Sequence, residues 1–267
     1  MEINNLPIGV FDSGMGGLTV LKSLRQQLPE ESFIYLGDTA RLPYGTKSSV
    51  TVQHYAVQMA KILVERQIKA LVIACNTATT AALPHLKELL HYMPVIGVVE
   101  PGAESAIRVT KNQRIAVLAT ETTIASNAYQ NNILKHMPNA MIRARSGSLL
   151  VALAEEGMVE NTIAKEAFKH YLQDFSEEDT LLLGCTHFPV FKPLLQSMLP
   201  ARVNIVDSAE ATAIFVKKIL KEQSLTGKGP HRPTRFLVTD SIERFQRVGQ
   251  IFLGESLEHK QLELIDA

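Results

Sequence analysis

Two stretches of the chain share one pattern: Ala70-Leu71-Val72-Ile73-Ala74-Cys75-Asn76-Thr77 and Thr180-Leu181-Leu182-Leu183-Gly184-Cys185-Thr186-His187. Each is an apolar run followed by a small residue, a cysteine and then polar residues. They contain the only two cysteines of the chain, one in each half. A short apolar run that ends in polar residues is typical of a buried strand entering a loop. The stretches therefore predict two equivalent strand ends.

Further apolar runs alternate with segments that carry apolar residues at helical spacing. The runs are residues 8–11, 33–36, 71–74, 95–98, 115–119, 181–183, 203–206 and 236–238. The helical segments include residues 51–66, 124–136, 163–175 and 209–221. This alternation predicts an α/β protein whose parallel sheets are covered by helices.

The matched cysteine segments favour a duplicated arrangement over one continuous sheet. We expect two pseudosymmetric lobes, each a mainly parallel sheet flanked by helices, with the active site between them. The first lobe would comprise residues 1–97 and 208–267, and the second residues 98–207. The loop-like stretch 226–233 precedes only one more strand and helix, which is too little for a separate domain. The C-terminal tail should therefore rejoin the first lobe.

Composition excludes several kinds of protein. The chain has 267 residues, of which 46% are hydrophobic, and Lys plus Arg balance Asp plus Glu at 27 each. Without a net positive field, nucleic acid and acidic membranes are not expected as principal partners. The first residues lack a basic and apolar leader, and no apolar run is long enough to span a membrane. These features predict a cytoplasmic protein with free thiols. Two thiols and one nearby histidine are a poor zinc set, so no metal is expected.

A glycine-rich turn follows the first apolar run: Asp12-Ser13-Gly14-Met15-Gly16-Gly17-Leu18. Such a turn brings backbone N–H groups and a helix N-terminus close to an anion. Its spacing matches neither the dinucleotide fingerprint nor the P-loop. The anion would then be a carboxylate, either of a substrate or of Asp12. Alternatively, the segment is only a tight turn in which Asp12 caps a helix.

The paired cysteines suit proton transfer to and from carbon. Removing the α-proton of an amino acid without a pyridoxal or metal electron sink needs a base on one face and an acid on the other. A thiolate and a thiol can take these roles and exchange them as the substrate inverts. Either cysteine alone is more often a small buried apolar residue, but the matched pair of Cys75 and Cys185 favours catalysis.

Polar neighbours could assist the thiols. Asp12 could orient or deprotonate one thiol, and His187 could orient the other or stabilise its charged form. A histidine after a strand is more often a structural residue, but among the 8 histidines only His187 adjoins a candidate base. Other polar side chains follow the cysteines directly and could bind substrate carboxylates or cap helices: Asn76, Thr77 and Thr186.

A series of motifs resembles those of the glutamate racemase family. They are Asp12-Ser13-Gly14-Met15-Gly16-Gly17-Leu18-Thr19-Val20, Gly37-Asp38-Thr39-Ala40, Pro43-Tyr44-Gly45, Ala74-Cys75-Asn76-Thr77-Ala78-Thr79 and Leu183-Gly184-Cys185-Thr186-His187-Phe188-Pro189. The motifs occur in family order and the resemblance covers nearly the whole chain. It implies an isomerase that interconverts L- and D-glutamate without a cofactor, supplies D-glutamate for peptidoglycan and is commonly a dimer of two-lobed subunits.

The resemblance also implies roles for individual residues. Cys75 would be the base toward D-glutamate and Cys185 the base toward L-glutamate. Asp12 would assist the first thiol and His187 the second, with Glu155 as a further acidic helper near His187. The implied substrate contacts are Ser13, Pro43, Tyr44, Gly45, Asn76, Thr77, Thr123 and Thr186.

The chain departs from the family pattern in two places. Thr122 lies where many relatives have glycine. The segment before Glu155 lacks the cysteine-proline motif that is usual in the family. Glu156 is therefore an alternative to Glu155. Relatives controlled by a cell-wall precursor carry an N-terminal extension, whereas seven residues precede the first strand here. We therefore expect activity that does not depend on an activator.

Two other functions fit the same residues. An aspartate racemase would use the same two-thiol chemistry on a shorter side chain, and the motifs do not fix side-chain length. A non-catalytic amino-acid-binding protein would keep the cleft without the reaction, although the presence of both thiols argues against it.

Overall fold

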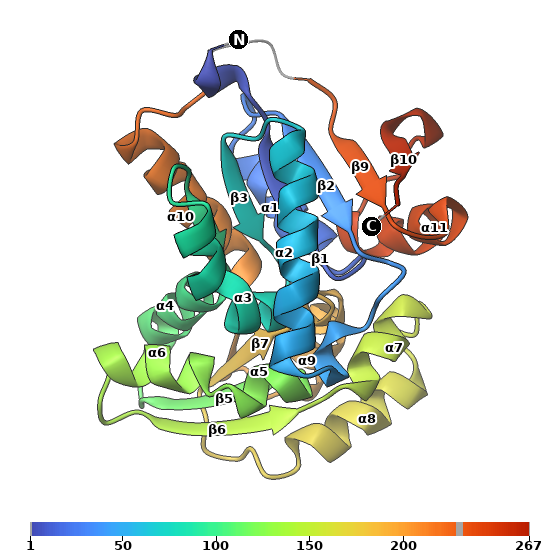
Figure 1. Cartoon of the computed structure of the whole chain (residues 1–267). Helices are drawn as coiled ribbons and strands as arrows, with labels where there is room; N and C mark the ends of the chain where they lie inside the picture. The colour runs from blue at the N-terminus through green and yellow to red at the C-terminus, as the bar shows by residue number, and fades with distance from the viewer. Residues whose placement is uncertain (1, 228–231, 267) are drawn as a thin grey trace.

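The computed structural model describes residues 2–227 and 232–266 as two parallel β-sheets covered by helices (Figure 1). Residues 228–231 of the predicted loop-like stretch 226–233 lie outside the described residues. The expected α/β class with two lobes is confirmed.

The first sheet has six strands in the order β10-β9-β2-β1-β3-β4, and every neighbouring pair is parallel. Its strands are β1 (Ile8–Asp12), β2 (Phe33–Gly37), β3 (Ala70–Ile73), β4 (Val95–Gly97), β9 (Arg235–Val238) and β10 (Leu262–Leu264). Because β9 pairs with β2, the C-terminal segment joins the sheet formed by the first hundred residues.

The second sheet has the order β6-β5-β7-β8, again parallel throughout. Its strands are β5 (Arg114–Ala119), β6 (Met141–Ser146), β7 (Thr180–Gly184) and β8 (Asn204–Asp207). In both sheets the first strand of the lobe lies between the second and the third, with the fourth beyond the third. The cysteines follow corresponding strands: Cys75 comes after β3, and Cys185 directly follows β7.

Helices cover both faces of each sheet. They are α1 (Leu18–Gln27), α2 (Ser49–Glu65), α3 (Asn76–Leu89), α4 (Val99–Val109), α5 (Glu121–Ala125), α6 (Ala128–His136), α7 (Leu149–Glu155), α8 (Thr162–Leu172), α9 (Lys192–Met198), α10 (Ser208–Glu222) and α11 (Ile242–Leu253). Short 3₁₀ turns are η1 (Ile3–Asn5), η2 (Tyr44–Thr46), η3 (Phe188–Phe191) and η4 (His259–Gln261). Burial on both faces explains why the strands read as continuous apolar runs.

The core consists of three clusters. The face of the first sheet that carries Phe11 packs on α2 and α3, and the opposite face, which carries Val10, packs on α1, α10 and α11. In the second sheet Val117 packs on α4 and α6, whereas Leu118 faces α7, α8 and η3. The cluster around Val10 also contains Leu118, so one core joins the two lobes.

Two details of the predicted elements were wrong. The segment predicted as one helix over residues 124–136 is two helices, because Asn127 adopts a left-handed conformation with φ 53° that ends α5 before α6 begins. The edge strands β6 and β10 were not predicted. Arg143 and Arg145 interrupt the apolar character of β6, which is tolerated because an edge strand is only partly buried.

A buried ion pair ties three distant segments together at the amino ends of the strands. Lys69 is almost fully buried, and its ammonium group donates to Asn4 O at 2.7 Å, to Leu225 O at 2.9 Å and to the Glu31 carboxylate. Glu31 Oε1 also accepts from Gly227 N at 2.7 Å. The pair thereby holds the N-terminal turn and the segment after α10 against the loop that precedes β2.

Replacing only one member of this pair should destabilise the protein strongly. Lys69→Met leaves the buried Glu31 carboxylate without its cation, and such a loss costs about 3–5 kcal/mol of unfolding free energy. Urea unfolding of the purified protein measures this. The double variant Lys69→Met/Glu31→Gln removes both charges and should recover much of the loss; equal stability of the single and double variants would contradict this account.

Candidate active site

The carboxyl ends of strands from both sheets border one cavity with an empty volume of about 380 Å³. The cavity is lined by Ser13, Gly14, Leu42, Pro43, Tyr44, Gly45, Cys75, Asn76, Thr77, Thr120, Val151, Glu155, Cys185, Thr186 and His187. Of the thirteen site residues that the sequence predicts, only Asp12 and Thr123 do not line it. Both cysteines therefore face the same space.

The topology explains why these residues meet. In each sheet the first strand lies between the second and the third. The second strand is therefore added on one side of the first strand, and the third strand on the other side. Ligands bind α/β sheets at the carboxyl ends of strands beside such a switch point. Asp12 ends β1 and Cys75 comes two residues after β3; in the second sheet Thr120 directly follows β5 and Cys185 directly follows β7.

Cys75 lies at the N-terminus of α3. Its sulfur accepts from Ala78 N at 3.4 Å, and its thiol donates to Ser13 Oγ at 3.6 Å. Burial raises the pKa of the Cys75 thiol to about 12, and the nearby negative charge of Asp12 adds to the shift. At neutral pH in the ligand-free protein this group is therefore a neutral thiol, able to donate a proton.

Asp12 is fully buried behind the cavity wall. Its carboxylate accepts from Gly14 N at 3.0 Å and from Thr186 Oγ1, across the lobe boundary, at 3.4 Å. Burial raises the pKa of Asp12, although the charge of His187 opposes the shift. Its influence on Cys75 is thus electrostatic, while its hydrogen bonds hold the glycine turn and the second lobe.

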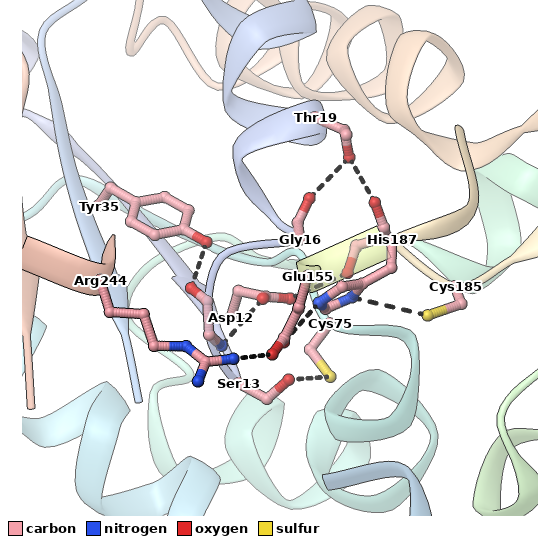
Figure 2. A network of polar contacts seen from close by, with 12 residues as sticks. Asp12, Ser13, Gly16, Thr19, Tyr35, Cys75, Glu155, Cys185, His187 and Arg244 are labelled. Atoms are coloured by element: carbon pink, nitrogen blue, oxygen red, sulfur yellow. Dashed lines mark hydrogen bonds and ion pairs between the residues drawn. The ribbon is translucent and has the colours of Figure 1, made fainter. Parts of the chain in front are cut away.

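The glycine turn touches the second lobe without any intervening side chain. A Cβ added at Gly16 would lie 2.3 Å from His187 Nδ1 and 2.5 Å from Thr186 Oγ1. The Thr19 hydroxyl lies 2.9 Å from Gly16 O and 3.1 Å from Thr186 O (Figure 2). The backbone of residues 14–17 therefore serves mainly to bring the lobes together, rather than to bind a nucleotide phosphate.

Cys185 has a different environment from Cys75. It precedes the 3₁₀ turn η3 instead of an α-helix, and its sulfur lies 3.9 Å from His187 Nδ1. His187 Nε2 lies 3.1 Å from Glu155 Oε1. Burial alone would lower the pKa of His187, but its contacts with Cys185 and Glu155 raise it to about 10. His187 is therefore a cation at neutral pH, placed beside the second sulfur (Figure 2).

The structure distinguishes the two candidate carboxylates of α7. Glu155 is buried and contacts His187, whereas Glu156 is exposed. Glu155 also forms an ion pair with Arg244 Nη2 at 2.9 Å. Arg244 was not predicted as a site residue, because an arginine on an amphipathic helix near the C-terminus carries no local signal of a site.

Three hydroxyl groups cluster at one side of the cavity. Thr77 Oγ1 lies 2.8 Å from Thr120 Oγ1 and 3.3 Å from Thr123 Oγ1, and the last two are 3.0 Å apart. Thr77 and Thr120 line the cavity, while Thr123 supports them from behind. Thr120 was not among the predicted site residues, since only the pairing of the lobes brings it to Thr77.

The turn that carries Pro43, Tyr44 and Gly45 closes another side of the cavity. Tyr44 donates to Asp38 Oδ2 at 2.5 Å, which fixes its ring. Thr122, at the position of a departure from the family pattern, lies with its hydroxyl 3.0 Å from Gly45 O and 2.9 Å from Lys47 O. The threonine thus adds a contact between the lobes at the cavity rim.

Asn76, which lines the cavity, has a buried donor without a partner in the described part of the chain. Its Oδ1 accepts from Tyr129 at 2.5 Å, but its buried Nδ2 has no hydrogen-bond partner among the described residues. A buried donor without a partner is costly, so an acceptor group on a ligand would be favoured here.

Two features are absent from the described residues. Within residues 2–227 and 232–266, no group of three or more His, Cys, Asp or Glu side chains could hold a metal ion. In the same part of the chain, no helix is both long and apolar enough to cross a membrane.

Comparisons with known proteins identify the family of the chain. The family described as Asp/Glu/Hydantoin racemase matches residues 8–216. Glutamate racemase of Neisseria meningitidis serogroup A is 41% identical over 262 residues, which cover 97% of this chain and 96% of the relative. That of Geobacter metallireducens is 46% identical over 256 residues, covering 94% and 93%.

Solved structures are similar over the same length. Glutamate racemase isoform RacE1 from Bacillus anthracis superposes with a TM-score of 0.93 at 36% identity, covering 98% of each chain. The Francisella tularensis enzyme in complex with D-glutamate gives a TM-score of 0.91 at 38% identity, with the same coverage. On sequence and structure together, the chain belongs to the Asp/Glu/hydantoin racemase family, among its glutamate racemases.

Proposed function

We propose that the protein interconverts L- and D-glutamate without a cofactor by a two-base proton transfer between Cys75 and Cys185. One observation carries this proposal: both thiols line one cavity, from opposite lobes, and each has its own set of polar partners. A thiol and a thiolate on opposite faces of the α-carbon satisfy the need for an acid and a base.

In the direction from L-glutamate, the Cys185 thiolate removes the α-proton while the Cys75 thiol delivers a proton to the other face. The raised pKa of Cys75 supports its role as the proton donor in this direction. The His187 cation next to Cys185 supplies the positive partner that a thiolate requires. In the reverse direction the two thiols exchange roles, with Asp12 close to the Cys75 side.

Substrate binding would use the polar wall of the cavity. The unpaired Asn76 Nδ2 and the hydroxyls of Thr77 and Thr186 are suited to carboxylate oxygens. The remaining proposed contacts are Ser13, Pro43, Tyr44, Gly45 and, from behind Thr77, Thr123. The bound D-glutamate of the Francisella tularensis relative supports an amino-acid ligand of this kind.

The wider role is part of the same proposal. The product D-glutamate would enter peptidoglycan synthesis in the cytoplasm, and the enzyme would act as a homodimer. Growth of a strain depleted of this protein on added D-glutamate tests the first point, and sedimentation of the purified protein tests the second.

Replacing either thiol should stop racemisation. In Cys75→Ala or Cys185→Ala one face of the α-carbon loses its acid or base, and the rate should fall by about 10²–10⁴-fold or more. Circular dichroism follows inversion in D₂O, and mass spectrometry follows deuterium at C2. Residual exchange should be confined to L-glutamate in Cys75→Ala and to D-glutamate in Cys185→Ala. A folded variant that racemises at a near-normal rate would refute the mechanism.

The protonated His187 should make stability depend on pH in one direction. Its pKa is raised from 6.5 to about 10, so its contribution is complete below about pH 6.5 and is lost as pH rises toward 10. The difference in unfolding free energy between the wild type and His187→Gln should therefore shrink across this window. Urea unfolding at several pH values measures it, and a difference that stays constant with pH would exclude a protonated imidazole.

The enzyme should prefer glutamate to aspartate. Curated relatives at 41% and 46% identity are glutamate racemases, whereas the aspartate racemase of Picrophilus torridus shares only 20% identity and the general fold. Competition of the two amino acids in one deuterium-exchange assay gives the ratio of their kcat/KM values. Preferential labelling of aspartate would assign the chain to the rival function.

A further inference from the structure

The C-terminal helix α11 reaches the Cys185 side of the cavity with two side chains. Arg244, in its first turn, forms the 2.9 Å ion pair with Glu155 Oε2. Phe252, near its end, packs edge-on against the His187 ring, with the ring centroids 5.0 Å apart and the planes at 75°. Figure 2 shows the Arg244 guanidinium meeting Glu155 on the side away from His187.

The Glu155 carboxylate is divided between two cationic groups. Its Oε1 faces His187 Nε2 and its Oε2 faces Arg244 Nη2. The Glu155 side chain is only 7% exposed, and a buried carboxylate needs partners for both oxygens. Burial acts to raise the pKa of Glu155, but the hydrogen bonds and charges of His187 and Arg244 hold it below its usual value. Glu155 therefore remains ionised at neutral pH.

An ionised Glu155 fixes the orientation of the imidazole. The carboxylate accepts a hydrogen bond from His187 Nε2–H, which leaves Nδ1 directed at the Cys185 sulfur. The ring cannot easily move, because Phe252 lies on one side and the Gly16 backbone on another. Besides Glu155, the charged or titratable groups that act on this ring are Cys185 and, from the end of β1, Asp12.

The geometry points to Arg244 as a positioning residue: by holding the second oxygen of Glu155, α11 aims the carboxylate at His187 and keeps the imidazole facing Cys185. Arg244 itself does not line the cavity, so it acts through Glu155 rather than on the substrate. The helix lies beyond residues 8–216, the range matched by the family. The inference rests on the proposed function, because that proposal gives Cys185 its role. The contacts of Arg244, Glu155 and His187 do not depend on that proposal.

The test compares the two thiols within one protein. Iodoacetamide alkylates the ligand-free enzyme over a range of pH, and mass spectrometry of the peptides gives a separate rate for each cysteine. In Arg244→Gln, Glu155 should keep its proton to higher pH, the imidazole should lose its counter-charge, and the thiolate at Cys185 should become rarer. The alkylation rate of Cys185 near about pH 6 should fall about two- to fivefold, the size expected for a partly exposed ion pair. The rate of Cys75 should not change.

Matched variants separate positioning from general loosening of the fold. Arg244→Lys keeps a cation and should restore most of the Cys185 rate. Arg247→Gln removes an exposed arginine of the same helix that has no ion pair with any described residue, and it should behave as wild type. Raising the salt concentration from about 0.1 to about 1 M should reduce the difference between wild type and Arg244→Gln, because a partly exposed pair is screened.

Poor access of iodoacetamide to the buried Cys185 sulfur could limit the alkylation rate, so a second measurement avoids the reagent. In the Cys75→Ala background, the ultraviolet absorbance of the thiolate reports Cys185 alone, and its titration should move in the same direction. An unchanged Cys185 profile in both measurements, or an equal change at Cys75, would overturn the inference. Neither readout needs turnover. Absence of racemisation in the wild type would therefore count against the proposed function while leaving this test intact.

Discussion

The approach of the Gly16 backbone to Thr186 and His187 is the contact on which the site depends. Any side chain at this position would occupy the space of the His187 ring, so the lobes could not close to their present separation. Asp12 and Thr19 reinforce the same contact through hydrogen bonds that cross the lobe boundary to Thr186. The cavity exists because these few atoms of two separate sheets fit against each other.

The two lobes repeat one topology but surround their sulfurs differently. The chain after β3 continues into a long helix, whose first N–H groups are directed at Cys75. The chain after β7 forms only a 3₁₀ turn, and a histidine with a buried carboxylate partner takes the place of the helix terminus beside Cys185. The repeated topology thus places the two sulfurs symmetrically. The residues that follow each cysteine give the two sulfurs different electrostatic surroundings.

Much of this arrangement could be predicted from the sequence, since strand ends in a parallel sheet carry their polar residues in a recognisable order. Asp12, Cys75 and Cys185 follow apolar runs directly, so local pattern was sufficient to find them. Contacts between distant segments left no such trace: Arg244 meets Glu155 only because the last helix packs beside α7, and Thr120 meets Thr77 only because the lobes close.

The unequal surroundings of the two sulfurs have a kinetic consequence for a racemase. Mirror-image substrates have the same free energy in water, so kcat/KM must be identical in the two directions whatever the protein does. The helix terminus at one sulfur and the imidazole at the other can therefore express their difference only in how strongly each enantiomer is held and how quickly it is released. A pocket built from two unlike halves can bind one enantiomer more tightly than the other. It cannot shift the final mixture away from equal amounts of the two enantiomers.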